Sequence, residues 1–264
     1  MRRIAMKLMM DDTAREDNAW RLAGSIGEFA AGAFSARVDV SRPELGLQHV
    51  ALHGRPLDAR LLCIGRDAAE PSARHWPVAD AYVRGGDLVA AYSPQDDWPF
   101  LPQVYWRANA SASTGEPLCS LSLFISVQTH LLDTWPQIQI QSQVPADESL
   151  LIAAGGAAAA ATSLSSGQHT IRPTTGPACV LQRLADEQFS YAEIMPASDF
   201  RELTITSDAT GSCGTRWELF GDFLEKGVIW RARLHAILLP RENDIALTRA
   251  HCLALEKRPL PLTT

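Results

Sequence analysis

Two segments of the chain repeat the same order of short stretches in which apolar and polar residues alternate, and this repetition constrains the fold most. Residues 78–132 and 189–239 each contain four such stretches, separated by turn residues. Alternation with a period of two is typical of strands that bury one face. Trp106 in the first segment aligns with Trp217 in the second. A repeated four-strand unit predicts a two-part, all-β protein.

We therefore predict an all-β fold, a large antiparallel β-sandwich of the supersandwich type, built from two similar halves with short peripheral helices. The expected parts are a helix at 11–33, a first β half at 34–150, a low-complexity linker at 151–177, a second β half at 178–240 and a helix at 244–257.

The two peripheral helices are predicted from apolar residues that recur three or four positions apart. Leu22, Ile26 and Phe29 have this spacing near the start, after Trp20, and Ile245 and Leu255 belong to a similar series near the end. Spacing of this kind places apolar side chains on one face of a helix. Such helices would cover an edge or an end of the sandwich.

Composition indicates a globular protein and argues against several partners. The chain has 264 residues, 46% hydrophobic and 20% charged, with a formal net charge of −6. Nucleic acids and anionic membranes require clustered Lys and Arg, and the sequence has no such cluster. The longest apolar run, residues 150–161, is mostly Ala and Gly and falls short of the roughly 20 residues that cross a bilayer. The start of the chain is a poor secretory signal because charged residues interrupt its apolar run.

The cysteine pattern and the absence of known motifs argue against several kinds of functional site. The five cysteines are scattered and never form a CxxC pair, so we expect no metal site and favour a reducing cytoplasm. The sequence contains no GxSxG, GxxxxGK[ST], HExxH or GxGxxG motif. We therefore expect no cofactor. The sequence does not decide whether the protein is an enzyme.

Three Trp-Pro pairs in the first half are the best candidates for a ligand site. They are Trp76-Pro77, Trp98-Pro99 and Trp135-Pro136. Proline holds the preceding residue extended, so each indole would leave its strand end at a fixed angle and could form a flat platform on which a sugar ring stacks. The alternative is that these tryptophans cap the core of the sandwich.

Acidic residues and a histidine lie beside these pairs. Asp96 and Asp97 precede Trp98, and His75 precedes Trp76, so carboxylates and an imidazole are available for sugar hydroxyl groups. The predicted ligand-binding residues are Trp76, Trp98, Trp135, Asp96, Asp97 and His75.

A second set of acidic residues lies in the second half. Glu193, Asp199 and Glu202 could converge on one sheet edge, and paired carboxylates are the minimum for acid–base chemistry on glycosides. Asp199, however, aligns with Asp87 in the repeat, which favours a structural role for both residues beside a turn.

In outline, a long two-part antiparallel sandwich resembles supersandwich proteins that handle carbohydrates, such as the aldose mutarotase class. The resemblance implies a carbohydrate ligand, although no catalytic motif of that class maps onto the sequence. We predict a cytoplasmic protein that binds or modifies a carbohydrate through its Trp-Pro loops, with no nucleic-acid or membrane partner. The alternative is a non-catalytic module that binds other proteins through a sheet face or edge. The oligomeric state stays open.

Overall fold

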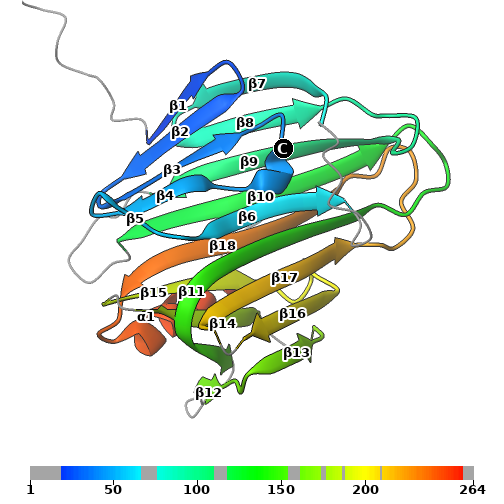
Figure 1. The fold of residues 1–264 in the computed structure, drawn as a ribbon. Helices are drawn as coiled ribbons and strands as arrows, with labels where there is room; N and C mark the ends of the chain where they lie inside the picture. The colour runs from blue at the N-terminus through cyan, green and yellow to red at the C-terminus, as the bar shows by residue number, and fades with distance from the viewer. Residues whose placement is uncertain are drawn as a thin grey trace, which may run out of the picture.

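Antiparallel strands make up most of the protein and form two packed sheets (Figure 1), which confirms the predicted all-β sandwich. The computed structural model describes residues 19–66, 76–109, 118–153, 161–173, 177–185, 188–208 and 210–257.

The smaller sheet has five strands in the order β1-β2-β3-β4-β5. Its strands are β1 (Trp20–Ala23), β2 (Ile26–Ala31), β3 (Phe34–Asp39), β4 (Gln48–Leu52) and β5 (Arg55–Pro56). The short 3₁₀ helix η1 (Pro43–Leu45) joins β3 to β4.

The larger sheet has thirteen strands. Its main path runs β13-β16-β17-β11-β14-β15-β18-β10-β9-β8-β7, and β12 and β6 pair with β11. These strands are β6 (Arg60–Arg66), β7 (Val78–Arg84), β8 (Asp87–Tyr92), β9 (Phe100–Asn109), β10 (Cys119–Thr129), β11 (Gln137–Ala153), β12 (Ala161–Ser163), β13 (Gly167–Ile171), β14 (Ala178–Leu184), β15 (Phe189–Met195), β16 (Glu202–Ser207), β17 (Ser212–Phe220) and β18 (Trp230–Pro240).

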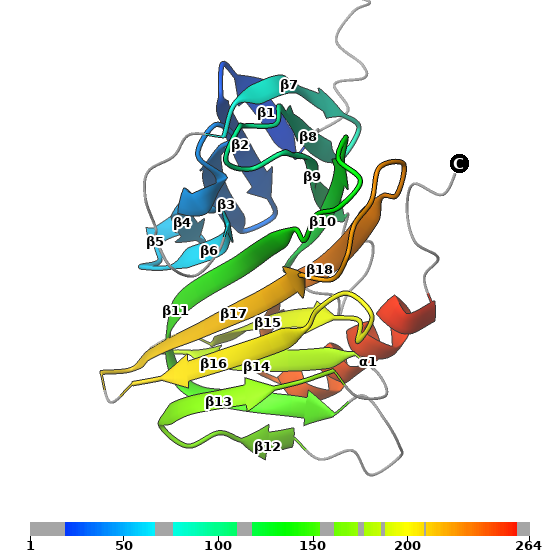
Figure 2. The same cartoon turned by 90° about the vertical axis from the view of Figure 1, so that its right-hand side faces the viewer.

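Strand β11 is 17 residues long and connects two parts of the larger sheet. Residues 137–145 pair with β17, and residues 146–153 pair with β14. The pairing with β14 is irregular between Ala146 and Glu148, directly after Pro145. A proline and a bulge at one place bend a strand and change its partners. The bend of β11 is visible in Figure 2.

The main core lies between the layers and collects the inward positions of both sheets. The small sheet packs against the β7–β10 end of the larger sheet (Figure 2). Trp106 on β9 and Trp217 on β17 are both fully buried in this core. Gly27 of β2 approaches β8 so closely that a Cβ atom there would lie 2.5 Å from a side-chain carbon of Leu88. The sheets are therefore in direct contact.

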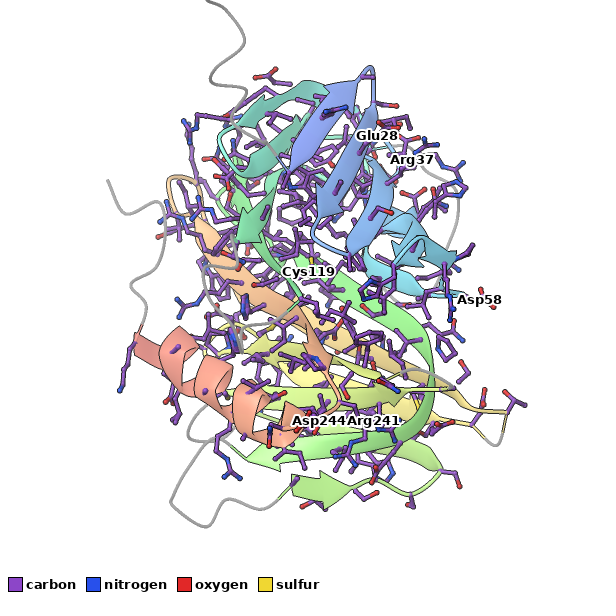
Figure 3. The ribbon with its side chains drawn as sticks, turned by 90° about the vertical axis from the view of Figure 1, so that its left-hand side faces the viewer. Glu28, Arg37, Asp58, Cys119, Arg241 and Asp244 are labelled. Carbon is purple, nitrogen blue, oxygen red and sulfur yellow. The ribbon has the colours of Figure 1, made fainter. Side chains whose placement is uncertain are left out.

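A second, smaller apolar cluster lies under the helix α1 (Asp244–Lys257), which covers the range that the apolar spacing predicts for the second helix. Cys252 and Leu255 of α1 pack here against residues of β14, β15 and β18. Asp244 anchors the start of the helix, near Arg241 in Figure 3, because it accepts hydrogen bonds from Arg183 and Ser190. No helix in the described ranges is both long and apolar enough to cross a membrane.

The helix predicted at 11–33 is wrong wherever the structure describes this range. Trp20–Ala23 and Ile26–Ala31 form the hairpin β1–β2, whose turn includes Gly24 with a φ of 60°. Within each strand alternate residues are buried, and the hairpin turn shifts this alternation so that it imitates a helical spacing across the whole segment. Residues 11–18 lie outside the described residues.

The predicted linker at 151–177 is also largely wrong. Strand β11 continues to Ala153, and β12 and β13 lie inside the range and pair with β11 and β16. Strand β18 of the second half pairs with β10 of the first, so one sheet joins the two parts. Residues 154–160 and 174–176 are outside the described ranges.

The repeated segments differ in strand pairing. Strands β7, β8, β9 and β10 are consecutive neighbours, whereas β15 pairs with β14 and β18, and β16 pairs with β13 and β17. Strands β15 and β16, which correspond to the paired strands β7 and β8 of the first segment, therefore pair with other strands and not with each other. Only the β8–β9 and β16–β17 pairs correspond between the segments.

Candidate functional site

The outward face of five neighbouring strands, β7, β8, β9, β10 and β18, carries a regular array of polar and aromatic side chains. Neighbouring residues along these strands alternate between this face and the core, as Leu88, Trp106, Leu123 and Leu234 do on the inward side. Strand register places the outward residues in three rows across the sheet. We call this surface the polar face. Its first row is Arg84, Asp87, Arg107, Ser122 and His235; its second is Tyr82, Val89, Tyr105, Phe124 and Arg233; its third is Asp80, Ala91, Gln103, Ser126 and Arg231.

The first row is ionic and hydrogen-bonded. Asp87 on β8 accepts two hydrogen bonds from Arg107 on β9, from Nε at 2.7 Å and from Nη2 at 2.8 Å. This paired contact raises the pKa of Arg107, because Asp87 stabilises the charged guanidinium. Both residues are thus fixed in orientation.

The first row ends at His235 on β18, whose ring is buried. Its Nδ1 lies 3.0 Å from Oγ of Ser122, and its Nε2 lies 3.4 Å from Oγ of Ser120. His251 of α1 stacks on the ring with centroids 5.6 Å apart. Asn109 donates hydrogen bonds to both serines, so the two hydroxyl groups link β9, β10 and β18. Helix α1 therefore borders the polar face at its β18 side.

The second row supplies the aromatic side chains of this face, of which Tyr82 and Phe124 are half-buried and Tyr105 is 7% exposed. Tyr105 and Phe124 are directly opposite one another on β9 and β10, and Tyr82 lies on β7 beyond Val89. The guanidinium carbon of Arg107 is 5.1 Å from the centre of the Phe124 ring. Burial raises the pKa of Tyr105, and nearby Tyr82 acts in the same direction, so the phenol stays protonated and can donate a hydrogen bond.

The arginines of β18 complete the second and third rows. The backbone N–H of Arg233 donates to Asp199 at 3.0 Å, and its Nε lies 3.4 Å from the same carboxylate oxygen. Burial raises the pKa of Asp199, although Ser198 and Arg233 oppose this shift. Arg231 is half-buried, and its Nε is buried without a hydrogen-bond partner among the described residues.

Two of the predicted Trp-Pro residues come together, but one is buried. The rings of Trp76 and Trp98 lie 5.3 Å apart. Trp76 is only 3% exposed, so it belongs to the core, as the alternative interpretation of the Trp-Pro pairs requires. Arg66 lies over Trp98 at 4.5 Å from the ring centre and covers part of this half-buried indole. Asp96 and Asp97 are exposed in the adjoining turn, and His75 lies outside the described residues.

Trp135 forms a separate group on another loop. It is 56% exposed and contacts Phe223 edge-on, with ring centroids 5.9 Å apart. The hydroxyl of Thr129 donates to the carbonyl of Pro99 at 3.0 Å, which places the start of this loop beside the Trp98 turn. The structure thus brings Trp76 and Trp98 into ring contact, and it gives Trp135 a different aromatic partner.

Glu193, Asp199 and Glu202, which could converge on one sheet edge according to the sequence, each contact different residues. Glu193 is 1% exposed in the main core. It accepts four hydrogen bonds, from Ser142 and Tyr191 on Oε1 and from Thr215 and Trp217 on Oε2. Asp199 instead joins Arg233, and Glu202 lies 3.6 Å from exposed Arg172. The buried Glu193 network therefore connects β11, β15 and β17 inside the sandwich.

The polar face is not among the sites that the sequence predicts, although the strands that form it carry a signal for it. In RARLHA of β18, the arginines and His235 alternate with core residues, and Tyr105 and Arg107 alternate with Trp106 in the same way. The sequence alone does not predict that β18 pairs with β10, or in which register. Across the described ranges, no group of three His, Cys, Asp or Glu side chains is arranged to hold a metal ion.

Comparison with known proteins gives a likeness of fold. No family model matches the sequence, and no curated protein matches it. A putative aldose 1-epimerase from Escherichia coli K12 superposes with a TM-score of 0.52 at 9% identity, over 81% of this chain and 98% of the other. A galactose mutarotase related enzyme from Lactobacillus acidophilus gives 0.50 at 10% identity, over 80% and 96%. The protein shares its fold with these two. At such identities the likeness concerns the fold alone.

Proposed function

We propose that this protein binds a carbohydrate on the polar face. The observation that carries the proposal is the aromatic row formed by Tyr82, Tyr105 and Phe124, which lies between two rows of hydrogen-bonding side chains. A sugar ring has an apolar face that stacks on aromatic rings, and its hydroxyl groups point outward around the rim. The polar face offers both kinds of contact in one surface.

The spacing of the rows suits a ligand of this size. Residues two apart on one strand lie about 7 Å apart, so the outer rows are about 13 Å from one another. A ring centred on Tyr105 and Phe124 would therefore reach Arg107 and Asp87 on one side and Gln103 and Ser126 on the other. Because Asp87 holds Arg107 by two hydrogen bonds, this pair is already oriented before a ligand arrives.

The fold is consistent with this proposal. The two solved proteins that share it carry names of sugar chemistry, aldose 1-epimerase and galactose mutarotase related enzyme. Fold alone does not fix function, so this support is secondary to the residues of the polar face. We propose binding and leave catalysis to the assay below.

The Trp-Pro loops remain a proposed second contact region for a longer saccharide. Trp98 and Trp135 have accessible ring surface, and Asp96 and Asp97 stand beside Trp98. We favour the polar face as the main site because Trp76 is buried and Arg66 already occupies part of Trp98.

Calorimetric titration with a panel of monosaccharides and short oligosaccharides tests the proposal. We expect Phe124→Ala to weaken binding about tenfold, which corresponds to about 1.4 kcal/mol. Ile26→Ala is the control, since Ile26 is 37% exposed on strand β2 of the small sheet, away from both proposed contact regions. Loss of binding with Trp98→Ala or Trp135→Ala instead would move the site to the Trp-Pro loops. Polarimetry with freshly dissolved α-D-galactose, run on the same samples, reports any epimerase activity.

A second candidate function, association with another protein, is favoured by two exposed apolar loops. Backbone hydrogen bonds between Thr134 and Leu224 hold the loops together. Their large side chains are unusually exposed: Leu131 48%, Leu132 74%, Trp135 56%, Phe223 49%, Val228 38% and Ile229 48%. Clustered exposed apolar residues are typical of interaction surfaces. If the chain self-associates through them, light scattering will show an oligomer that Leu132→Asp reduces to a monomer.

A further inference from the structure

Four arginines lie on the polar face, although the protein as a whole is acidic. They are Arg84, Arg107, Arg231 and Arg233. The chain carries 24 Lys and Arg against 30 Asp and Glu. A local concentration of guanidinium groups on such a chain requires an explanation, because like charges on one sheet face repel each other.

Two of these arginines already have carboxylate partners. Asp87 accepts two hydrogen bonds from Arg107, and Asp199 lies against both the backbone and the side chain of Arg233. The positive charges of Arg107 and Arg233 are therefore neutralised by these two carboxylates. These pairs account for the acidic residues nearest to the aromatic row.

Arg231 differs from Arg107 and Arg233. It has no ion pair within the part of the chain that the structure describes, and its buried Nε has no hydrogen-bond partner there. The only acidic residue of its row, Asp80, is four strands away at the β7 edge, roughly 19 Å distant. A buried guanidinium N–H without an acceptor is costly unless a ligand supplies one.

The position of Arg231 places it beside the proposed sugar site. It is opposite Ser126 on β10 and two residues before Arg233, which is itself opposite Phe124. Arg231 is therefore a diagonal neighbour of Phe124 across the β10–β18 pair. A ring stacked on Phe124 and Tyr105 could therefore direct a substituent toward Arg231.

We propose that the carbohydrate bound on the polar face carries an acidic group and that Arg231 binds this group. The inference rests on the proposed function. An arginine presents its N–H groups as a planar fork that matches carboxylate, phosphate and sulfate oxygens, whereas a neutral hydroxyl uses only part of this fork. The acidic group also neutralises the one β18 arginine that has no carboxylate partner.

Calorimetric titration compares D-glucose, D-glucuronate, D-glucose 6-phosphate and inorganic phosphate on the full chain. We expect at least one acidic sugar to bind tenfold or more tightly than D-glucose, with affinity that falls as salt is added. The two acidic sugars distinguish a carboxylate from a phosphate as the recognised group.

Arg231→Gln should abolish the preference for the acidic sugar while leaving the weak binding of D-glucose in place. Arg231→Lys keeps the charge but lacks the fork, so it should retain only part of the preference. The matched control is Arg37→Gln, which removes one positive charge from the small sheet, where Arg37 pairs with Glu28 (Figure 3). Thermal unfolding of each variant checks that it is folded.

Each outcome separates this inference from the proposed function. Equal affinity for neutral and acidic sugars, or an acidic preference that persists in Arg231→Gln, overturns the inference and leaves carbohydrate binding intact. Binding of inorganic phosphate that depends on Arg231, without binding of any sugar, overturns the proposed function and keeps the anion site. No binding of any of the four compounds overturns the inference, and the absence of binding to every sugar of the wider panel overturns the proposed function as well.

Discussion

The hydrogen bond between Trp217 and Glu193 allows a direct measurement of what the buried polar network contributes to stability. Trp217 Nε1 donates to Glu193 Oε2 at 2.6 Å in the main core. Trp106 is also fully buried, yet its Nε1 has no hydrogen-bond partner among the described residues. Replacing each tryptophan by phenylalanine removes a similar volume from the core. Only the Trp217→Phe change removes a hydrogen bond.

The expected difference follows from the kind of bond that is lost. A hydrogen bond to a carboxylate contributes about 1.5–3 kcal/mol to the free energy of unfolding. Trp217→Phe should therefore be more destabilising than Trp106→Phe by about this amount. With a urea m-value near 2 kcal/mol per M, a difference of about 2 kcal/mol separates the two unfolding midpoints by about 1 M.

Urea unfolding followed by circular dichroism measures both variants. Glu193→Gln, alone and combined with Trp217→Phe, closes a double-mutant cycle whose coupling energy should match the difference between the two tryptophan variants. If Trp217→Phe and Trp106→Phe cost the same within about 0.5 kcal/mol, the hydrogen bond makes no net contribution to stability and the reasoning is refuted.

Three further predictions concern other parts of the molecule. Burial raises the pKa of Asp244, but hydrogen bonds from Arg183 and Ser190 outweigh it, so the pKa is lowered overall. The carboxylate therefore stabilises the folded state above pH 3.8, and this stabilisation is lost as the pH falls through the folded-state pKa. Asp244→Asn should cost about 1–3 kcal/mol at pH 7 and little at low pH, which thermal unfolding at several pH values will test. Gly46→Ala should lower the free energy of unfolding by more than about 2 kcal/mol, because φ is 64° there and the new methyl group would meet the carbonyl oxygen of Leu61. Gly54→Ala should cost less in the same urea unfolding assay, because φ is 75° there but the added methyl group would enter open space. Burial raises the pKa of Cys63 to about 11, so in the native protein this thiol should react with a disulfide reagent at pH 8 about 100-fold more slowly than a free thiol; a rate equal to that of the free thiol would contradict this.

Much of the fold follows from local sequence patterns. Residues that alternate between apolar and polar in β8, β9, β10 and β18 predict which side chains face the core, because neighbouring residues of a strand point to opposite faces. The helix at 244–257 follows from apolar spacing in the same way. The first hairpin was predicted as a helix, because the turn at Gly24 interrupts its alternation and the remaining spacing resembles a helical one.

The candidate site required information that no local pattern contains. Trp76 is one example of what the sequence could not predict. A Trp-Pro pair predicts the angle at which an indole leaves its strand, but contacts with Tyr92 and Trp98 bury the ring of Trp76. The acidic residues of the second half show it too, since Glu193 faces the core while Asp199 reaches Arg233 on β18. Which partner each side chain meets depends on the strands placed beside it.

By itself, the sequence determined the all-β class and the alternation between the buried and outward sides of the strands. The tertiary structure alone decided that β18 lies between β10 and β15 and that the second repeated segment is divided between two places in the sheet. The polar face exists only because of this order. Alternation is a property of one strand, whereas the register between distant strands is set by the packing of the whole core.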